Sequence, residues 1–457
     1  MDVLLDVLRK QRLFFDSHRT KSVAFRKKAL KRLEKEIELR EDAICDALYA
    51  DFKKPKFETL SAETQFVLSE LKLAIKNVAL WARPERKSGT LLNWPSSDWV
   101  YKEPYGSVLI IAPWNYPFQL VFAPLIGAVA AGNTVVAKPS EATPNTSRVI
   151  KEIITAVFLP EHVSVVEGGV ETSQRLLDQK WDYIFFTGST RVGKIVYESA
   201  ARYLTPVTLE LGGKNPCIVD ETAALNLAAK RIVWGKFLNA GQTCIAPDYI
   251  LVESSVKDKL IEALKRSIEQ CYGESGASPD YARLVNKKHY EGLKEMLRGE
   301  DILFGGETND SDNFMAPTLV DEPEIDSKLM EGEIFGPILP IIAYDSDSDI
   351  HKYITRYGKP LAAYVFSTDK KFQDKIITDY SFGGGAINDT VIHITNKKLP
   401  FGGVGPSGIG AYHGKRSFEM YSHQKAIIKK PNWLDVPLRY PPYNFPLKFI
   451  KKVKHLF

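Results

Sequence analysis

The residue best suited to act as a nucleophile is Cys244, in the stretch AGQTCIAPDY. The apolar patterns on either side predict a short loop between a helix and a strand. Gly241 and Pro247 bracket this loop, and its small residues leave room around the sulfur for a tetrahedral adduct. The alternative is a buried structural cysteine, which is the usual state of an unpaired Cys. Cys217, inside the apolar run NPCIVD, has no such room, and we assign it to the core.

The second candidate is an acidic residue inside an apolar, strand-like run. Glu210 lies in VTLELGGK and is followed by two glycines. A buried carboxylate is costly unless it is paired or functional, and burial raises its pKa toward neutrality. Glu210 would then serve as a general base for water. The alternative is an ion pair with Lys214 or Arg231.

Polar residues also follow other strand-like runs. Asn115 comes after SVLIIA in the motif APWNYP, and a side-chain amide at a strand end can stabilise an oxyanion. Lys138 and Glu141 follow the next run in AKPSE, where a cation and an acid can hold ribose hydroxyl groups. EIFGP, with Glu333 and Phe335, and PFGGVGPSGIG lie at strand ends as well. Each of these motifs alone is a weak indication of a site. Their common feature is the position at the end of a predicted strand.

A glycine turn follows the apolar run in DYIFFTGSTRVGKIV. Gly188 ends the run and Gly193 opens a helix-like stretch, an order that suits a phosphate or dinucleotide because helix N-terminal amides attract anions. A P-loop needs Ser or Thr where Ile195 stands, and GxGxxG needs Gly where Thr190 stands. By itself this turn, with Ser189 in it, is either a cofactor site or an ordinary connection.

These candidates require a parallel α/β framework to position them. Short apolar runs alternate with amphipathic segments from Ser107 onward, and the alternation restarts after Pro206. This predicts two α/β units, with a ligand cleft between their sheets, behind an N-terminal helical region. DWVYKEP and HQKAIIKK fall outside the alternation. They either pair into a projecting sheet used for oligomerisation or form two unrelated edge strands.

Composition narrows the function classes. The 457 residues, 44% of them hydrophobic and 26% charged, predict a globular protein of two or three domains. A net charge of +5 is too small to indicate nucleic-acid binding. The four cysteines form no CxxC pair, so we expect neither a disulfide framework nor a metal site. We find no signal peptide and no apolar run long enough to span a membrane, and we expect a cytoplasmic protein.

Taken together, seven motifs resemble the aldehyde dehydrogenase family. They are APWNYP, KPSE, FTGST, LELGGKNP, GQTC, EIFGP and PFGG, in the family's order. AYHGKRSFEMYSH and the tail RYPPYNFPLK resemble its class-3 and fatty-aldehyde branch. The resemblance implies an α/β fold of three parts: N-terminal helices with a Rossmann-like cofactor domain (1–85 and 104–209), an α/β catalytic domain (210–400), and a small bridging sheet with the C-terminal tail (86–103 and 401–457).

The resemblance also implies roles for individual residues. Cys244 matches the catalytic thiol, Glu210 the general base, and Asn115 the oxyanion donor, which acts together with the backbone amide of Cys244. The implied cofactor contacts are Lys138 and Glu141 at the adenosine ribose, Gly188, Ser189 and Gly193 in the pyrophosphate turn, and Glu333 and Phe335 at the nicotinamide ribose. The implied reaction converts an aldehyde into a carboxylic acid through a thiohemiacetal and a thioester on the cysteine.

Cofactor and partners follow from the same resemblance. We expect NAD first, because Glu141 would bind a free 2′-hydroxyl and repel a 2′-phosphate, with NADP also accepted. The branch implies medium- or long-chain aliphatic or aromatic aldehydes and a homodimer. Trp114, Tyr116 and Phe401 are compatible with an apolar substrate tunnel.

The sequence leaves two alternative functions. One is an acylating, coenzyme A-dependent dehydrogenase, but the retained Glu210 argues against it because hydrolysis of the thioester requires a base. The other is a non-catalytic protein that keeps the fold. Separately, the tail NFPLKFIKKVKHLF interleaves apolar and basic residues. It is either a helix for peripheral membrane or partner contact, or a segment lying on the subunit surface.

Overall fold

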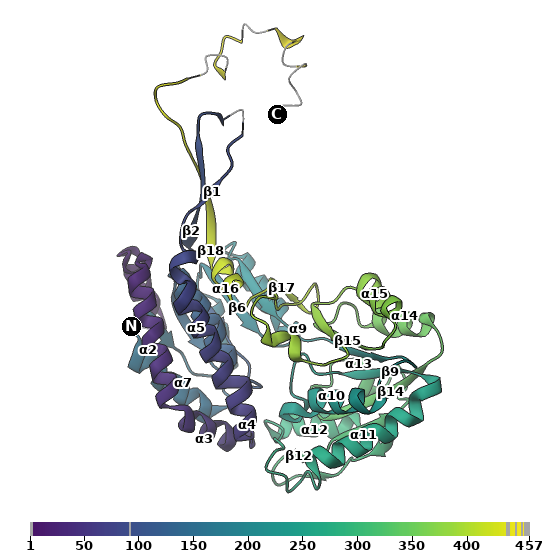
Figure 1. Cartoon of the computed structure of the whole chain (residues 1–457). Coiled ribbons are helices and arrows are strands. Elements are labelled where there is room, and N and C mark those ends of the chain that lie inside the picture. The colour runs from purple at the N-terminus through teal and green to yellow at the C-terminus, as the bar shows by residue number, and fades with distance from the viewer. Residues whose placement is uncertain (1–2, 91–92, 436–438, 444–445, 449–450, 452–457) are drawn as a thin grey trace.

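The computed structural model describes residues 3–90, 93–435, 439–443, 446–448 and 451. Two α/β units lie side by side, and a narrow arm projects from them (Figure 1). This arrangement confirms the predicted fold class of a Rossmann-like unit, a second α/β unit and a small third sheet.

The sheet of the first unit has the strand order β17-β7-β6-β3-β4-β5. The neighbouring strands β7, β6, β3, β4 and β5 are parallel, and β17 is antiparallel at the edge. The bounds are β3 (Ser107–Ile111), β4 (Thr134–Lys138), β5 (Val163–Val165), β6 (Tyr183–Thr187), β7 (Val207–Glu210) and β17 (Gly408–Ile409). The prediction that the run ending at Glu210 opens the second unit is therefore wrong, because β7 pairs with β6 and places Glu210 opposite Thr187.

Helices cover both faces of this sheet. One face packs against α1 (Val3–Asp16), α8 (Val170–Leu177) and α9 (Thr190–Ala201). On the other face, α6 (Gln119–Ala131) and α7 (Pro144–Val157) pack on the strands. An outer layer of three helices covers these two: α2 (Val23–Leu39), α3 (Glu41–Phe52) and α5 (Gln65–Trp81). Helix α6 is buried throughout, because α2 and α5 cover its outer side, and its sequence is accordingly apolar all round.

The second unit is built on a seven-stranded sheet of order β10-β13-β14-β9-β8-β15-β16, in which β10 alone is antiparallel to its neighbour. Its strands are β8 (Pro216–Val219), β9 (Tyr249–Glu253), β10 (Asp301–Phe304), β13 (Thr318–Asp321), β14 (Ile338–Tyr344), β15 (Ala362–Phe366) and β16 (Gly384–Ile387). Its helices are α10 (Leu225–Phe237), α11 (Lys257–Tyr272), α12 (Lys287–Met296), α13 (Lys328–Glu331), α14 (Asp347–Arg356) and α15 (Lys370–Asp379), and β11 (Thr308–Asn309) pairs with β12 (Phe314–Met315).

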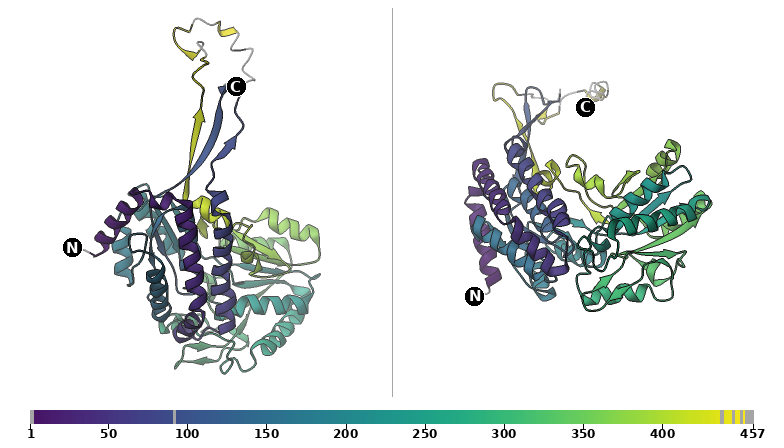
Figure 2. Two further views of the ribbon diagram at one scale, coloured as in Figure 1. Left: turned by 60° about the vertical axis from the view of Figure 1, so that its left-hand side comes forward. Right: turned by 60° about the horizontal axis from the view of Figure 1, so that its bottom comes forward.

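The projecting arm is a three-stranded antiparallel sheet, visible from two further sides in Figure 2. β2 (Ser97–Pro104) pairs along its whole length with β18 (Ser422–Lys429), and β1 (Glu85–Lys87) flanks β2. The predicted pairing of DWVYKEP with HQKAIIKK is thus confirmed, and the reading as two unrelated edge strands is wrong. The prediction that residues 401–421 belong to the arm is wrong. Strand β17 joins the first sheet, and α16 (Lys415–Met420) packs on α6.

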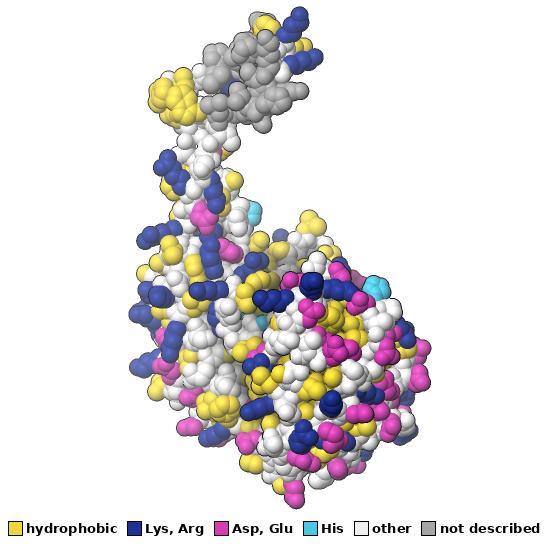
Figure 3. Space-filling view, turned by 45° about the vertical axis from the view of Figure 1, so that its right-hand side comes forward, with side chains coloured by type: hydrophobic (Ala, Val, Ile, Leu, Met, Phe, Trp, Pro, Cys, Tyr) yellow, Lys and Arg dark blue, Asp and Glu magenta, His cyan; other side chains and the backbone are white. Residues whose placement is uncertain are grey.

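The surface of the second unit carries charges of both signs. On the face shown in Figure 3, acidic and basic side chains intermingle over the second unit. No helix within the described residues is long and apolar enough to cross a membrane. The same residues hold no group of three His, Cys, Asp or Glu side chains that could bind a metal ion. The C-terminal tail 444–457 lies largely outside the described residues.

Candidate active site

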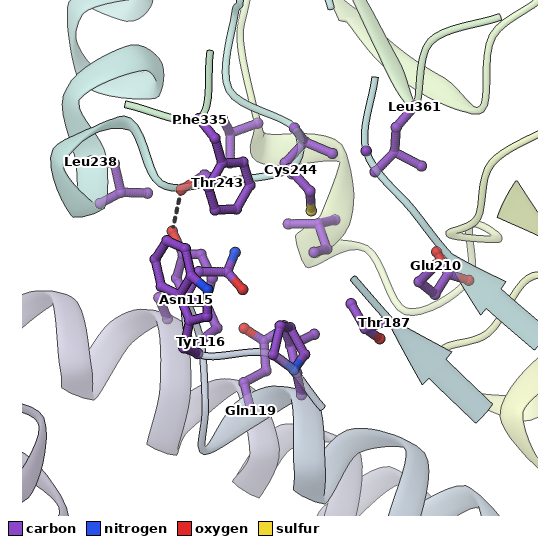
Figure 4. Close-up of a pocket in the computed structure, with 18 of the residues that line it drawn as sticks. Asn115, Tyr116, Gln119, Thr187, Glu210, Leu238, Thr243, Cys244, Phe335 and Leu361 are labelled. Atoms are coloured by element: carbon purple, nitrogen blue, oxygen red, sulfur yellow. Dashed lines mark hydrogen bonds between the residues drawn. The ribbon is translucent and has the colours of Figure 1, made fainter. Parts of the chain in front are cut away.

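A cavity of about 1280 Å³ lies between the two sheets, beyond the carboxyl ends of β3, β6 and β7. Ligands of open α/β sheets bind at this kind of edge. Seven of the ten predicted site residues line the cavity: Asn115, Gly188, Ser189, Glu210, Cys244, Glu333 and Phe335. Cys244, Asn115 and Glu210 come from three separate segments and lie around one open space (Figure 4). The other three predicted residues, Lys138, Glu141 and Gly193, are not among the residues that line the cavity in the described part of the chain.

Cys244 is carried by a sharply turned loop after α10. Asn239 and Ala240 adopt positive φ angles of 56° and 52°, and Gly241 follows with a φ of 75°. Gly241 is required at this point, because an added Cβ would lie 2.3 Å from the carbonyl oxygen of Gly336. Asn215 then fixes the far side of the loop by donating from Nδ2 to the carbonyl oxygen of Cys244 at 2.8 Å. Backbone geometry therefore sets the position of the thiol.

The surroundings of Cys244 favour the protonated form of its thiol. Burial raises its pKa, and the negative charges of Glu333 and Glu210 raise it further. Cys45 and Cys217 are buried in the core as predicted, and Cys271 is exposed. Because the thiolate is the nucleophilic form, Cys244 reacts through its minor ionised fraction.

We expect the alkylation of Cys244 by iodoacetamide in cofactor-free enzyme to accelerate about tenfold per pH unit between roughly pH 7 and pH 9. Mass spectrometry of the labelled peptides gives a separate rate for each cysteine. Burial raises the pKa of Glu333 to about 8, so its negative charge acts on the thiol above that pH. Glu333→Gln should accordingly speed the labelling most in the upper part of the range. A rate that does not change with pH would mean that the free enzyme stabilises a thiolate.

Asn115 lies on the loop between β3 and α6, opposite the cysteine loop. Its Nδ2 donates to the carbonyl oxygen of Gln242 at 3.1 Å, and its own carbonyl oxygen accepts from Asn239 Nδ2 at 2.9 Å. A second bond links the same two loops, because the hydroxyl groups of Tyr116 and Thr243 are 2.7 Å apart (Figure 4). The buried amide is thus held beside the cavity at a fixed angle, as an oxyanion donor must be.

Glu210 ends strand β7 with a buried carboxylate, neither oxygen of which has a hydrogen-bond partner among the residues that the structure describes. Burial raises its pKa well above the ordinary value. The alternative of an ion pair is wrong, because Lys214 pairs with Asp248 at 2.8 Å and Arg231 lies 3.8 Å from Asp389. An unpartnered, basic carboxylate lining a cavity suits a general base for water.

The glycine turn opens α9 toward the cavity. Ser189 caps this helix by accepting from the backbone amide of Val192, and Gly188, Ser189 and Thr190 all line the cavity. Gly193 lets α9 pack closely, because an added Cβ would lie 2.6 Å from Cδ2 of Leu211, which also lines the cavity. A helix N-terminus open to a cavity fits the phosphates of a dinucleotide.

Glu333 and Glu141 are the two acidic residues predicted to contact the ribose groups of the cofactor. The side chain of Glu333 approaches the backbone so closely that a Cβ at Gly212 would lie 2.0 Å from Oε2. The buried Lys138 donates to Glu141 Oε2 at 2.8 Å, and the Glu141 side chain is 49% exposed. Burial of Glu141 is outweighed by this hydrogen bond, so its pKa lies below the ordinary value. These carboxylates are available to accept from ribose hydroxyl groups.

Several lining residues could not be found from local sequence. His289 on α12 hydrogen-bonds through Nε2 with the carbonyl oxygen of Phe335 at 2.8 Å, although its context in the sequence is an ordinary helix. This bond holds Phe335, which has a positive φ of 55°, against the edge of Trp114. Burial lowers the pKa of His289, so the ring is neutral. Tyr412 and Thr187 line the cavity as well.

Comparison with known proteins assigns the chain to a family. The family model described as the aldehyde dehydrogenase family matches residues 7–427. The chain belongs to the aldehyde dehydrogenase family. The earlier resemblance is confirmed, and this aldehyde dehydrogenase is an oxidoreductase that acts on aldehydes.

Among the relatives of this aldehyde dehydrogenase is the 4,4'-diaponeurosporen-aldehyde dehydrogenase of Staphylococcus aureus, which is 49% identical over 454 residues and 99% of each chain. Aldehyde dehydrogenase family 3 member A2 of Rattus norvegicus is 44% identical over 95% of this chain and 90% of that protein, in agreement with the predicted branch. A dimeric, NADP-preferring aldehyde dehydrogenase of Canis lupus familiaris is 40% identical over 97% and 98%. A solved substrate-bound state of Staphylococcus aureus AldH superposes with a TM-score of 0.97 at 48% identity, covering 99% of this chain and 100% of that one.

Proposed function

We propose that this enzyme performs NAD(P)-dependent oxidation of aldehydes with Cys244 as the nucleophile, Asn115 as the oxyanion donor and Glu210 as the base. One observation carries the assignment: three separate segments bring these side chains around one cavity, and within the described part of the chain the Glu210 carboxylate there has no hydrogen-bond partner. A fold-retaining, non-catalytic protein has no need for that arrangement, because an unpaired buried carboxylate is costly.

The residues divide the reaction into two halves. The fraction of Cys244 that has released its proton to solvent adds as thiolate to the aldehyde carbon, and the Asn115 amide donates to the oxygen that becomes negative. Bound NAD(P) supplies the hydride acceptor for the oxidation. A thioester then remains on Cys244, and Glu210 takes a proton from water while the hydroxyl oxygen attacks the thioester carbon. The carboxylic acid leaves and the thiolate is restored.

The chain's own groups fit a dinucleotide. The N-terminus of α9 with Gly188 and Ser189 would hold the phosphates, Lys138 and Glu141 the adenosine ribose, and Glu333 the nicotinamide ribose. Glu141 would accept from a free 2′-hydroxyl and repel a 2′-phosphate, so we rank NAD first. Glu141 is partly exposed and forms an ion pair with Lys138, which partly offsets its charge, so we keep NADP as a second cofactor.

Asn115→Ala is expected to lower kcat by about two to three orders of magnitude, because one oxyanion donor contributes roughly 3 kcal/mol to transition-state stabilisation. The KM for the aldehyde should change much less, since the charge develops only after binding. Steady-state kinetics with one aldehyde and saturating cofactor measure both constants. A large rise in KM with an unchanged kcat would assign Asn115 to substrate binding instead.

Apolar aldehydes suit this cavity. Its walls include the apolar side chains of Phe57, Leu120, Trp234 and Leu238. We propose medium- or long-chain aliphatic and aromatic aldehydes as substrates. The proposal is tested by following reduced nicotinamide with aldehydes of increasing chain length and with NAD and NADP in parallel. No turnover with any pair would overturn the function.

The remaining assignments extend this proposal. Release of the free acid without coenzyme A is expected, and acyl-coenzyme A formation would favour the acylating alternative.

We propose a cytoplasmic protein that forms a homodimer through the arm. The dimeric relative from Canis lupus familiaris supports the dimer. Peripheral membrane contact through the tail is a further proposal, and truncation at Asn444 followed by vesicle binding tests it.

A further inference from the structure

A helical segment behind the cavity carries two buried carboxylates. α4 (Lys56–Thr59) passes into a π-helical turn (Leu60–Thr64) before α5 begins. Glu58 and Glu63, five residues apart, are both buried. A π turn closes its hydrogen bonds over five residues, so it brings positions five apart onto one side of the helix. Turns of this kind are rare and occur often at functional sites.

Glu63 holds the loop that carries Asn115. Its Oε2 accepts from the backbone amides of Phe118 at 3.0 Å and Gln119 at 2.8 Å, at the start of α6. Its Oε1 accepts from Lys54 Nζ at 2.7 Å, and neither side chain of this pair is exposed. The ammonium group of Lys54 also lies 3.8 Å from the ring centroid of Tyr116. The carboxylate thereby anchors the end of the Asn115 loop from behind.

Glu58 holds the loop that carries Cys244. Its Oε2 accepts from the backbone amide of Asn239 at 3.0 Å, in the turn of positive φ angles before the cysteine. Asn239 Nδ2 in turn donates to the carbonyl oxygens of Asn115 at 2.9 Å and Gln242 at 3.2 Å. Glu58 therefore contacts one of the residues that join the two catalytic loops, and it does so from the first unit to the second.

We infer that Glu58 and Glu63 are positioning residues, which fix the Asn115 amide and the Cys244 thiol relative to each other across the two units. The inference rests on the proposed roles of Asn115 and Cys244. Without Glu58, the buried amide of Asn239 loses its acceptor and the strained turn can relax. The thiol would then move relative to the oxyanion donor, while substrate and cofactor still find their own contacts.

The test compares Glu58→Ala with Glu58→Gln and with Asp51→Ala. Asp51 is the matched control, because it also accepts from backbone amides at a helix start, those of Asn145 and Thr146 in α7, away from the cavity. Glu58→Ala should lower kcat by about tenfold to a hundredfold, the scale of small misplacements in active sites, with little change in either KM. Alkylation of Cys244 should change severalfold as well. Glu58→Gln keeps an oxygen acceptor and should restore most of both rates.

The control separates positioning from stability. Asp51→Ala should lower the melting temperature without moving kcat or the labelling rate of Cys244. If Glu58→Ala lowers the melting temperature but leaves kcat and labelling at the control's level, the positioning role is overturned. Activity that survives Cys244→Ala would instead overturn the proposed function, so the two failures are distinguishable.

Glu63 is tested by its coupling to Asn115. Glu63→Gln and Asn115→Ala should each lower kcat, and the double variant should lose less than the product of the two single effects, because contacting residues that act as a unit are not additive. Full additivity would mean that Glu63 does not act through the Asn115 loop and would overturn its part of the inference.

Discussion

Replacing Cys244 by Ala should lower kcat by about five orders of magnitude, the scale of losing a covalent nucleophile. The sulfur forms both covalent intermediates of the proposed reaction. Cys45 and Cys217 are buried in the core. Cys271 also lines the cavity, but it lies at the end of α11, outside the loops that carry Asn115 and Cys244. The assay is aldehyde-dependent formation of reduced nicotinamide at saturating concentrations of both substrates.

The control for this variant is Cys45→Ala, which removes a buried thiol from α3. It should cost stability, because it leaves a small cavity in the core, and should keep kcat. Cofactor binding, followed by fluorescence, should survive in the Cys244→Ala protein. A residual activity within about tenfold of the parent would contradict nucleophilic catalysis, since position and oxyanion stabilisation alone leave far less.

The catalytic residues could be predicted where a reactive side chain stands out from the local pattern of apolar and polar residues. Cys244 and Glu210 could be predicted because each breaks a local rule: one is a cysteine in a roomy turn, the other an acid in an apolar strand. Asn115 followed because side chains at the carboxyl ends of parallel strands meet at one edge of a sheet. The cofactor residues needed the family resemblance, because the glycine turn by itself left two readings open.

Other features depend on contacts between distant parts of the chain. Strand β7 joins the first sheet because it pairs with β6, and the alternation of elements contains no sign of that choice. His289 reaches the cavity only through the fold of α12, and Glu58 is 181 residues from its partner Asn239. Residues 401–421 return to the first unit through a short edge strand, which carries too few residues for a periodic signal.

Glu210→Gln should divide the reaction at the thioester. The amide keeps the shape of the carboxylate but cannot take a proton from water, so kcat should fall by about three orders of magnitude, within the range of general-base catalysis. The first half of the reaction does not need this base, and a rapid burst of about one reduced nicotinamide per site should therefore persist. Mass spectrometry should then find the acyl group on Cys244.

The burst distinguishes this role from its alternatives. Burial raises the pKa of Glu210 well above its ordinary value, so its base form gains in population as the pH rises, and the deacylation rate of the parent enzyme should rise with it. Glu210→Gln should abolish that dependence, whereas Glu36→Gln, at an ion pair with Arg40 outside the cavity, should keep both kcat and the pH profile. If the burst disappears together with turnover, Glu210 is needed before the thioester forms. It would then act on the Cys244 thiol, whose raised pKa requires a proton acceptor, rather than on water.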